Sequence, residues 1–209
     1  SCPGVDPPED VVLVEQQAAD VLFLSSAATD LSTLASYLAS AGGEHWRNQI
    51  RGLSLDCLSH PAQLDHYLAS TAIQAKLVLV RLLGGRGHWS YGLEQLQRWK
   101  DGGEGRHLVI LAGTDDQNNE LHGLGSISLA LADRLAELLR EGGVDNLGEV
   151  LRALELLLQE QQPDPTDLQL LPMPDPAPWD WRDDAGPRIG VVLYRAQLQA
   201  GDVSLAEAL

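Results

Sequence analysis

Short apolar runs recur along the chain and alternate with segments of helical periodicity. The clearest runs are Asp20–Ser26, Leu77–Leu83 and His107–Ala112, with Ile50–Leu55 as a further candidate. Runs of this length, rich in branched residues and bounded by glycine or polar residues, are typical of strands buried on both faces of a sheet. Val11–Val14 is shorter, and we expect it to form an edge strand.

The segments between these runs are predicted to be helices. Apolar residues recur at three- and four-residue intervals at Leu31, Leu34, Ala35 and Leu38, at Leu64, Leu68 and Ala72, at Ile127, Leu131, Leu135, Leu138 and Leu139, and at Leu147, Val150, Leu151, Leu154, Leu157 and Leu158. Thr29 or Asp30 can cap the first helix, and Pro61 suits the first turn of the second. Asn146 and Glu149 have the spacing of a capping box for the last one.

Strands that alternate with helices imply a mostly parallel sheet with helices on both faces. We therefore predict a flavodoxin-like, Rossmann-like α/β fold, in which right-handed crossovers place the carboxyl ends of the strands along one edge. That edge is expected to collect Ser25–Ser26, Asp56–Cys57, Gly84–Tyr91 and Gly113–Asn119. Ligands of open α/β sheets bind in the crevice at this edge.

Proline and aspartate mark the expected domain boundaries. Residues 1–10 form an acidic, proline-rich tail, and residues 11–160 form the α/β head domain. Residues 161–187 are a Pro/Asp-rich linker, and residues 188–209 supply the first strand and helix start of a second domain. We expect this chain to be a fragment of a longer protein.

The chain is strongly acidic, with a formal net charge of −16 and a sequence pI near 4.5. Such a surface repels phosphate backbones and anionic lipids, so we expect neither nucleic acid nor a membrane as a partner. No apolar run approaches the roughly 20 residues of a membrane span, and no signal-peptide pattern is visible. Cys2 and Cys57 are too few for a disulfide framework. The expected location is the cytoplasm.

The candidate binding site centres on the stretch that follows the Leu77–Leu83 run. Gly84, Gly85 and Gly87 come first, and glycine lets the chain turn sharply and lets a ligand approach its backbone. The plainer interpretation is a tight connection between a strand and a helix. We consider these three glycines as substrate-binding or docking residues.

Aromatic and acidic side chains complete this candidate site. His88 can ligate a metal or move a proton near neutral pH, while Trp89 and Tyr91 offer flat surface to a planar ligand or to another protein segment. Asp115 and Asp116 could hold a cation. The alternatives are that Trp89 packs under the loop with His88 in solvent, and that the two aspartates only solvate a loop or cap a helix.

Familiar catalytic patterns are missing from the sequence. The third glycine of a dinucleotide fingerprint would fall at Ser90, and no P-loop motif is present. His60 and His66 lack the spacing of a metal site on a helix. No HExxH, GxSxG or Ser/His/Asp arrangement is legible. We therefore predict no catalytic residue and no metal site within this chain.

Several stretches resemble the large subunit of aerobic cobaltochelatase, the CobN type, a family related to the porphyrin-binding H subunit of magnesium chelatase. The similar stretches are Ala19–Ala35, His60–Leu96, Leu111–Leu121, Leu139–Leu154 and Arg188–Leu209. Their order is preserved, and RLLGG…W.YG, within the second stretch, is the most specific part.

This resemblance implies that the chain is the amino-terminal head of an ATP-dependent metal chelatase subunit. The implied reaction inserts Co²⁺ into a corrin precursor, hydrogenobyrinic acid a,c-diamide, in cobalamin biosynthesis. The implied complex uses ATP, Mg²⁺ and Co²⁺, with ATP hydrolysed by separate AAA+ subunits. The remaining domains of the large subunit would be further partners. The metal-inserting residues are expected elsewhere in the full subunit, so this part would be non-catalytic.

A second hypothesis is a non-enzymatic α/β docking or regulatory module similar to a receiver domain. Such a module needs an aspartate at a strand end, an acidic pair, and a lysine at the end of a later strand. Asp56 and Asp115–Asp116 meet the first two requirements. Lys76 stands at the beginning of its strand, which counts against this hypothesis.

Overall fold

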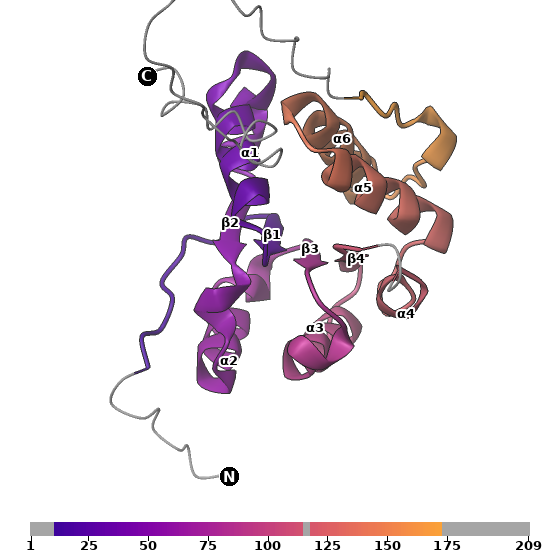
Figure 1. Cartoon of the computed structure of the whole chain (residues 1–209). Coiled ribbons are helices and arrows are strands. Elements are labelled where there is room, and N and C mark those ends of the chain that lie inside the picture. The colour runs from indigo at the N-terminus through magenta and orange to yellow at the C-terminus, as the bar shows by residue number, and fades with distance from the viewer. Residues whose placement is uncertain (1–10, 115–117, 173–209) are drawn as a thin grey trace, which may run out of the picture.

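The computed structural model describes residues 11–114 and 118–172, and these form a three-layer α/β domain (Figure 1). Its sheet has four parallel strands in the order β2-β1-β3-β4. The strands are β1 (Val21–Ser25), β2 (Ile50–Ser54), β3 (Leu77–Leu82) and β4 (His107–Ala112). The predicted flavodoxin-like α/β fold is confirmed, because this order reproduces the 2-1-3-4 start of that topology.

Helices cover both faces of the sheet. The α-helices are α1 (Ala28–Ala39), α2 (Pro61–Ser70), α3 (Ser90–Asp101), α4 (Asn118–His122), α5 (Leu129–Glu141) and α6 (Val144–Leu158). Short 3-10 helices are η1 (Ala41–Trp46), η2 (Leu55–Leu58), η3 (Ala72–Gln74), η4 (Arg86–His88) and η6 (Pro165–Asp167). In Figure 1, α1, α5 and α6 lie above the sheet and α2 and α3 below it, while α4 lies beside β4.

Alternate residues of each strand enter two separate hydrophobic cores. Phe23 and Leu79 pack in the core under α1, α5 and α6. Leu24 and Val80 pack in the core over α2 and α3. All four side chains are fully buried, so these strands are apolar on both faces, as their continuous hydrophobicity predicted.

The outer edge of β4 is closed by the segment between α4 and α5. The Ala112 N–H donates to His122 Nε2 at 3.0 Å, and the Leu108 N–H donates to Ser126 Oγ at 2.8 Å. The Ser126 N–H donates in turn to the Leu108 carbonyl at 2.7 Å. A side chain at Gly125 would come within 2.8 Å of that carbonyl, which explains the glycine. The backbone groups of Leu108 and the Ala112 N–H are therefore already paired at the edge where a flavodoxin-like sheet would place a fifth strand.

Three local predictions are wrong. Val11–Val14 forms no strand. The N-cap of α1 is Ala27 rather than Thr29 or Asp30, because Asp30 is turned inward by buried partners. α6 begins at Val144 after Gly143, so no Asn146–Glu149 capping box forms. Pro61 does occupy the first turn of α2, as predicted.

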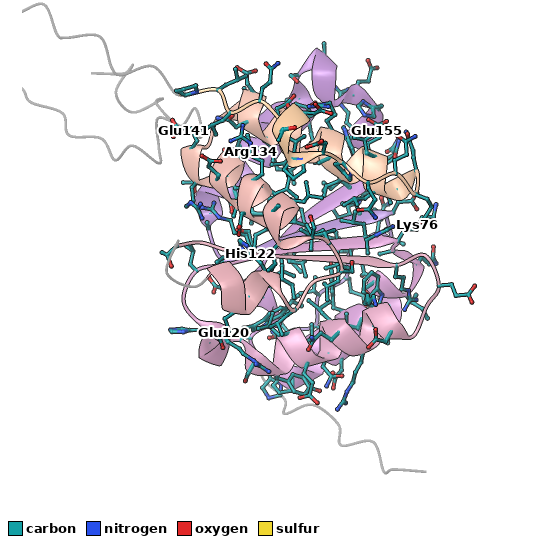
Figure 2. All side chains as sticks on the ribbon, turned by 90° about the vertical axis from the view of Figure 1, so that its right-hand side faces the viewer. Lys76, Glu120, His122, Arg134, Glu141 and Glu155 are labelled. Carbon is teal, nitrogen blue, oxygen red and sulfur yellow. The ribbon has the colours of Figure 1, made fainter. Side chains whose placement is uncertain are left out.

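The first residues of the expected linker pack against the helical layer. Leu168 is 1% exposed and belongs to the core under α5 and α6. Arg134 of α5, labelled in Figure 2, donates to the Leu168 carbonyl from Nε at 3.0 Å and Nη2 at 2.7 Å. Asn146 of α6 holds Leu171 through both backbone groups, at 2.7 and 2.8 Å. The expected second domain lies outside the described residues.

Candidate functional site

The strand order reverses direction between β1 and β3, and the loops that follow these two strands are joined. The Leu83 N–H donates to Ser26 Oγ at 2.7 Å. The Ser26 N–H donates to the Arg81 carbonyl at 3.1 Å. In open α/β sheets, the crevice for a ligand lies outside the carboxyl ends of the strands at this switch point. These contacts fix the two loops relative to each other at that position.

A buried polar cluster lies directly beneath the joined loops. Asp30, in the first turn of α1, accepts hydrogen bonds from the Ser25 hydroxyl at 2.5 Å and from Arg81 Nη1. The Ala27 N–H donates to Ser25 Oγ at 3.0 Å. The side chains of Arg81 and Asp30 are only 8% and 5% exposed. We name Ser25, Asp30 and Arg81 the switch-point cluster.

Burial dominates the electrostatics of the switch-point cluster. Removal from water raises the pKa of Asp30 above its ordinary value, and the nearby Arg81 guanidinium and the Ser25 hydroxyl partly offset this rise. Arg81 Nε is buried and has no hydrogen-bond partner among the described residues. Asp30 and Arg81 therefore form a desolvated ion pair that depends on both partners. Sequence analysis did not identify this cluster, although a charged residue inside the LVLVRLL run was a visible signal.

The glycines of the predicted site make a compact turn. Gly84 has φ +92°, a conformation that favours glycine. The imidazole of His88 folds over it, about 3.0 Å from where a side chain on Gly84 would begin. Gly87 faces open space, and the side chain of His88 is exposed. The structure therefore brings Gly84 and His88 together, with Gly85 between β3 and η4.

Trp89 and Tyr91 leave this turn in different directions. Trp89 is half-buried, packs over Gly92, and donates from Nε1 to the Leu58 carbonyl at 3.2 Å. The Tyr91 hydroxyl donates to Asp65 of α2, with both carboxylate oxygens within 3.0 Å. The alternative in which Trp89 packs under the loop while His88 faces solvent is the one that the structure supports. The Trp89 and Tyr91 side chains therefore contact different elements, η2 and α2.

Asp115 and Asp116 lie outside the described residues, so the cation-binding hypothesis for them stays a prediction. Within residues 11–114 and 118–172, no group of three or more His, Cys, Asp or Glu side chains could hold a metal ion. Lys76 lies at the amino end of β3 and forms an ion pair with Asp20 at 3.1 Å. It is therefore at the opposite edge of the sheet from the position that a receiver-like site requires.

His122 is a second polar centre that sequence analysis missed. It is fully buried between α4, β4 and α5, where Figure 2 labels it. Its Nε2 accepts the Ala112 N–H, so the neutral ring carries its proton on Nδ1 and donates it to Asp133 Oδ1 at 2.7 Å. Burial lowers the pKa of His122, with an opposing contribution from Asp133. All its hydrogen-bonding capacity is used to hold β4, α4 and α5 together.

The switch point presents hydrogen-bond donors at the surface of the domain. Exposed Arg86 and His88 offer donors at the surface of an acidic protein. Ala27, an apolar N-cap, leaves the first amides of α1 without a side-chain acceptor. Such donors suit an acidic group on a ligand or on a neighbouring domain. Asp30 and Arg81 are already engaged with each other beneath them.

Comparison with known proteins identifies relatives for the chain. No protein-family model matches it. It is 31% identical to the aerobic cobaltochelatase subunit CobN of a Sinorhizobium species, over 93% of this chain and 16% of that protein. It is 28% identical to the CobN subunit of Pseudomonas aeruginosa, over 96% of this chain and 17% of that protein.

The chain is also similar to a solved structure of a cobaltochelatase subunit. The catalytic subunit of cobaltochelatase from Mycobacterium tuberculosis superimposes with a TM-score of 0.56 and 26% sequence identity. The match covers 90% of this chain and 14% of that chain. The resemblance inferred from the sequence is confirmed, and the chain spans about one sixth of the length of its curated relatives. No described helix is long and apolar enough to cross a membrane.

Proposed function

We propose that this chain, which is homologous to a part of aerobic cobaltochelatase CobN subunits, is the amino-terminal head of the large, tetrapyrrole-binding subunit of an ATP-dependent metal chelatase. The full subunit would insert Co²⁺ into hydrogenobyrinic acid a,c-diamide on the route to cobalamin. Its location would be the cytoplasm, and its partners would be AAA+ ATPase subunits. The observation that carries this proposal is similarity to two CobN subunits over 93% and 96% of the chain.

The role of the head domain in this proposal is to bind or to position, without catalysis. Metal insertion requires groups that strip water from a cation and groups that accept the pyrrole protons. The described residues include no candidate metal cluster. The acidic and basic side chains of the switch-point cluster are paired with each other and buried. We expect the chain alone to have neither chelatase nor ATPase activity.

The loop of Gly84, Gly85, Gly87 and His88 would provide the contact with the substrate. The substrate is an acid, and exposed Arg86 and His88 can donate hydrogen bonds to carboxylates. Trp89 lies under this loop and would report on its occupation by a change in fluorescence. Asp115 and Asp116, which lie outside the described residues, are proposed as further contacts with the substrate.

The reaction can be tested with the full-length subunit. Combined with its ATPase subunits, ATP, Mg²⁺, Co²⁺ and the corrin acid, it should form a cobalt corrinoid that is detected by absorbance. No product would form without ATP. Failure under conditions in which the Pseudomonas aeruginosa subunit forms product would contradict the proposal.

The binding role has its own test. Titration of the chain with the corrin acid should quench tryptophan fluorescence weakly, and Trp89→Phe should remove most of the signal. Trp46→Phe, on η1 at the other end of α1, is the matched control and should retain it. No quenching in the wild-type chain would assign the loop to docking against another domain.

A further inference from the structure

An acidic groove lies between α6 on one side and α1 with η1 on the other. Its volume is about 470 Å³, within the range of roughly 300–1,000 Å³ found for ligand sites. Tyr37 of α1 and Trp46 of η1 form one wall. Gly148 of α6 forms part of the other, where an added side chain would come within 3.1 Å of the Tyr37 ring. The absence of a side chain at position 148 therefore lets the Tyr37 ring approach α6 closely.

Three carboxylates of α6 line this groove, those of Asp145, Glu149 and Glu155. The basic side chains of His45 and Arg152 line it as well. Glu149 is neutralised by Arg152 at 2.7 Å. Asp145 and Glu155 form no ion pair among the described residues, and Figure 2 labels Glu155. Two unpaired negative charges thus remain, one at each end of the paired centre.

The electrostatic effect of Glu155 is seen on its neighbour across the groove. Burial raises the pKa of Tyr37, and the Glu155 carboxylate raises it further. An exposed apolar side chain, Leu171, closes one end, where Asn146 fixes its backbone. The groove therefore combines an apolar and aromatic surface with unpaired negative charge.

Charge identifies the class of occupant. The chain carries a formal charge of −16, so a second copy would be repelled. The residues that follow the groove, 173–187, contain four aspartates and a single arginine, and would be repelled as well. A complementary occupant has to be basic. Its chemistry also has to include an apolar side chain for the Tyr37 and Leu171 surface.

We propose that this groove docks an extended basic segment of a partner protein, with two Lys or Arg side chains flanking an apolar residue. Asp145 and Glu155 are ten positions apart on α6, which is about 15 Å at 1.5 Å per residue. An extended peptide covers this length with about four or five residues. One basic side chain pairs with Asp145, the other pairs with Glu155, and the apolar residue packs between them. The interaction is distinct from the loop contact proposed for the substrate, because it lies at the end of α1 far from Ala28.

The test uses the full-length subunit and a fluorescently labelled peptide, acetyl-Lys-Ala-Leu-Ala-Lys-amide, followed by fluorescence anisotropy. The variant D145N/E155Q removes the two unpaired charges without changing side-chain size. The matched control D56N/E104Q removes two exposed carboxylates outside the groove, neither of which forms an ion pair among the described residues. We expect the Kd to rise by about three- to tenfold in D145N/E155Q and to stay unchanged in the control.

A peptide with glutamate in place of both lysines should not bind. An equal rise of the Kd in both double variants would show that the peptide is attracted by the overall negative charge of the protein and not by the groove. This result would overturn the proposal. An unchanged Kd in D145N/E155Q would do the same. Dimerisation that D145N/E155Q abolishes in analytical ultracentrifugation would assign the groove to a second copy and would also refute it. Cobalt insertion is measured separately, so a failed docking test leaves the proposed reaction standing.

Discussion

The switch-point cluster and the His122 centre both bury ionisable side chains at the carboxyl edge of the sheet. The partners of these side chains differ between the two centres. Asp30 and Arg81 form a charged pair in which Arg81 Nε has no partner among the described residues. His122 stays neutral, with both ring nitrogens hydrogen-bonded. The first lies beneath the joined loops that follow β1 and β3, and the second closes the outer edge of β4. The difference indicates that the pair at the β1/β3 position depends on both of its charges, whereas the β4 edge is held by the hydrogen bonds of a neutral ring.

The largest effect is expected when one partner of the charged pair is removed. Arg81→Met leaves the Asp30 carboxylate buried without its cation, which should lower the free energy of unfolding by about 3–5 kcal/mol. Urea denaturation followed by circular dichroism measures this loss.

The matched control removes both charges. Because no unpaired charge is left, D30L/R81M should recover most of the stability lost in Arg81→Met. A double variant that is no more stable than the single one would show that the pair is held by more than mutual neutralisation.

A smaller loss is expected at His122. His122→Ala leaves the Ala112 N–H without its acceptor in a fully buried position, which should cost about 1–3 kcal/mol. His122→Gln supplies an oxygen acceptor near Nε2 and should lose less. If both variants lose the same free energy of unfolding in urea, the imidazole of His122 stabilises the fold through its volume and not through its hydrogen bonds.

The two centres should also respond to pH with opposite signs. The folded-state pKa of His122 is lowered from 6.5, so the unfolded chain takes up the proton first and stability falls as the pH drops below about 6.5. The folded-state pKa of Asp30 is raised from 3.8, so the folded protein binds its proton more tightly. The Asp30 contribution therefore decreases as the pH rises above about 3.8.

Single-site variants separate these two pH effects. Between pH 8 and pH 5, the stability advantage of the wild type over His122→Gln should shrink by at most about 1.4 kcal/mol per pH unit. Between pH 7 and pH 4, the wild type should gain relative to Asp30→Asn. Parallel curves for the wild type and both variants would contradict the assigned directions.

The smallest effect is expected at an exposed pair. Lys76 and Asp20 are 62% and 43% exposed, and Figure 2 shows Lys76 at the surface. Lys76→Gln should change stability by less than about 1 kcal/mol, because solvent screens such pairs. A loss as large as that of Arg81→Met would remove the link between burial and energy on which this comparison depends.

Most of the strands and helices could be predicted from the sequence, because buried parallel strands appear in it as apolar runs. Strands β1 to β4 and helices α1, α2, α5 and α6 follow from hydrophobic spacing and from glycine positions such as Gly142. The cap of α1 was misassigned, because local propensity favours Thr29 or Asp30 whereas a tertiary partner, Arg81, draws Asp30 inward. Val11–Val14 was misassigned because an apolar run alone does not specify a partner strand.

The candidate site was only partly predictable. The position of the loop after β3 follows from topology, and Gly84 does adopt positive φ. The directions of Trp89 and Tyr91 depend on Leu58 and Asp65, which are distant in sequence. The pairing of Arg81 with Asp30, 51 residues away, is equally invisible to periodicity. The first two contacts depend on packing against η2 and α2, and the third depends on packing of α1 against the sheet. No local pattern encodes either.

The most direct test of the central claim is cobalt insertion by the full-length subunit together with its ATPase subunits. We predict ATP-dependent formation of a cobalt corrinoid from hydrogenobyrinic acid a,c-diamide, and no product from the 209-residue chain alone. Cobalt insertion by the isolated chain would contradict the non-catalytic role. Absence of product from the full-length subunit, in an assay in which the Pseudomonas aeruginosa subunit is active, would contradict the assignment to a cobaltochelatase.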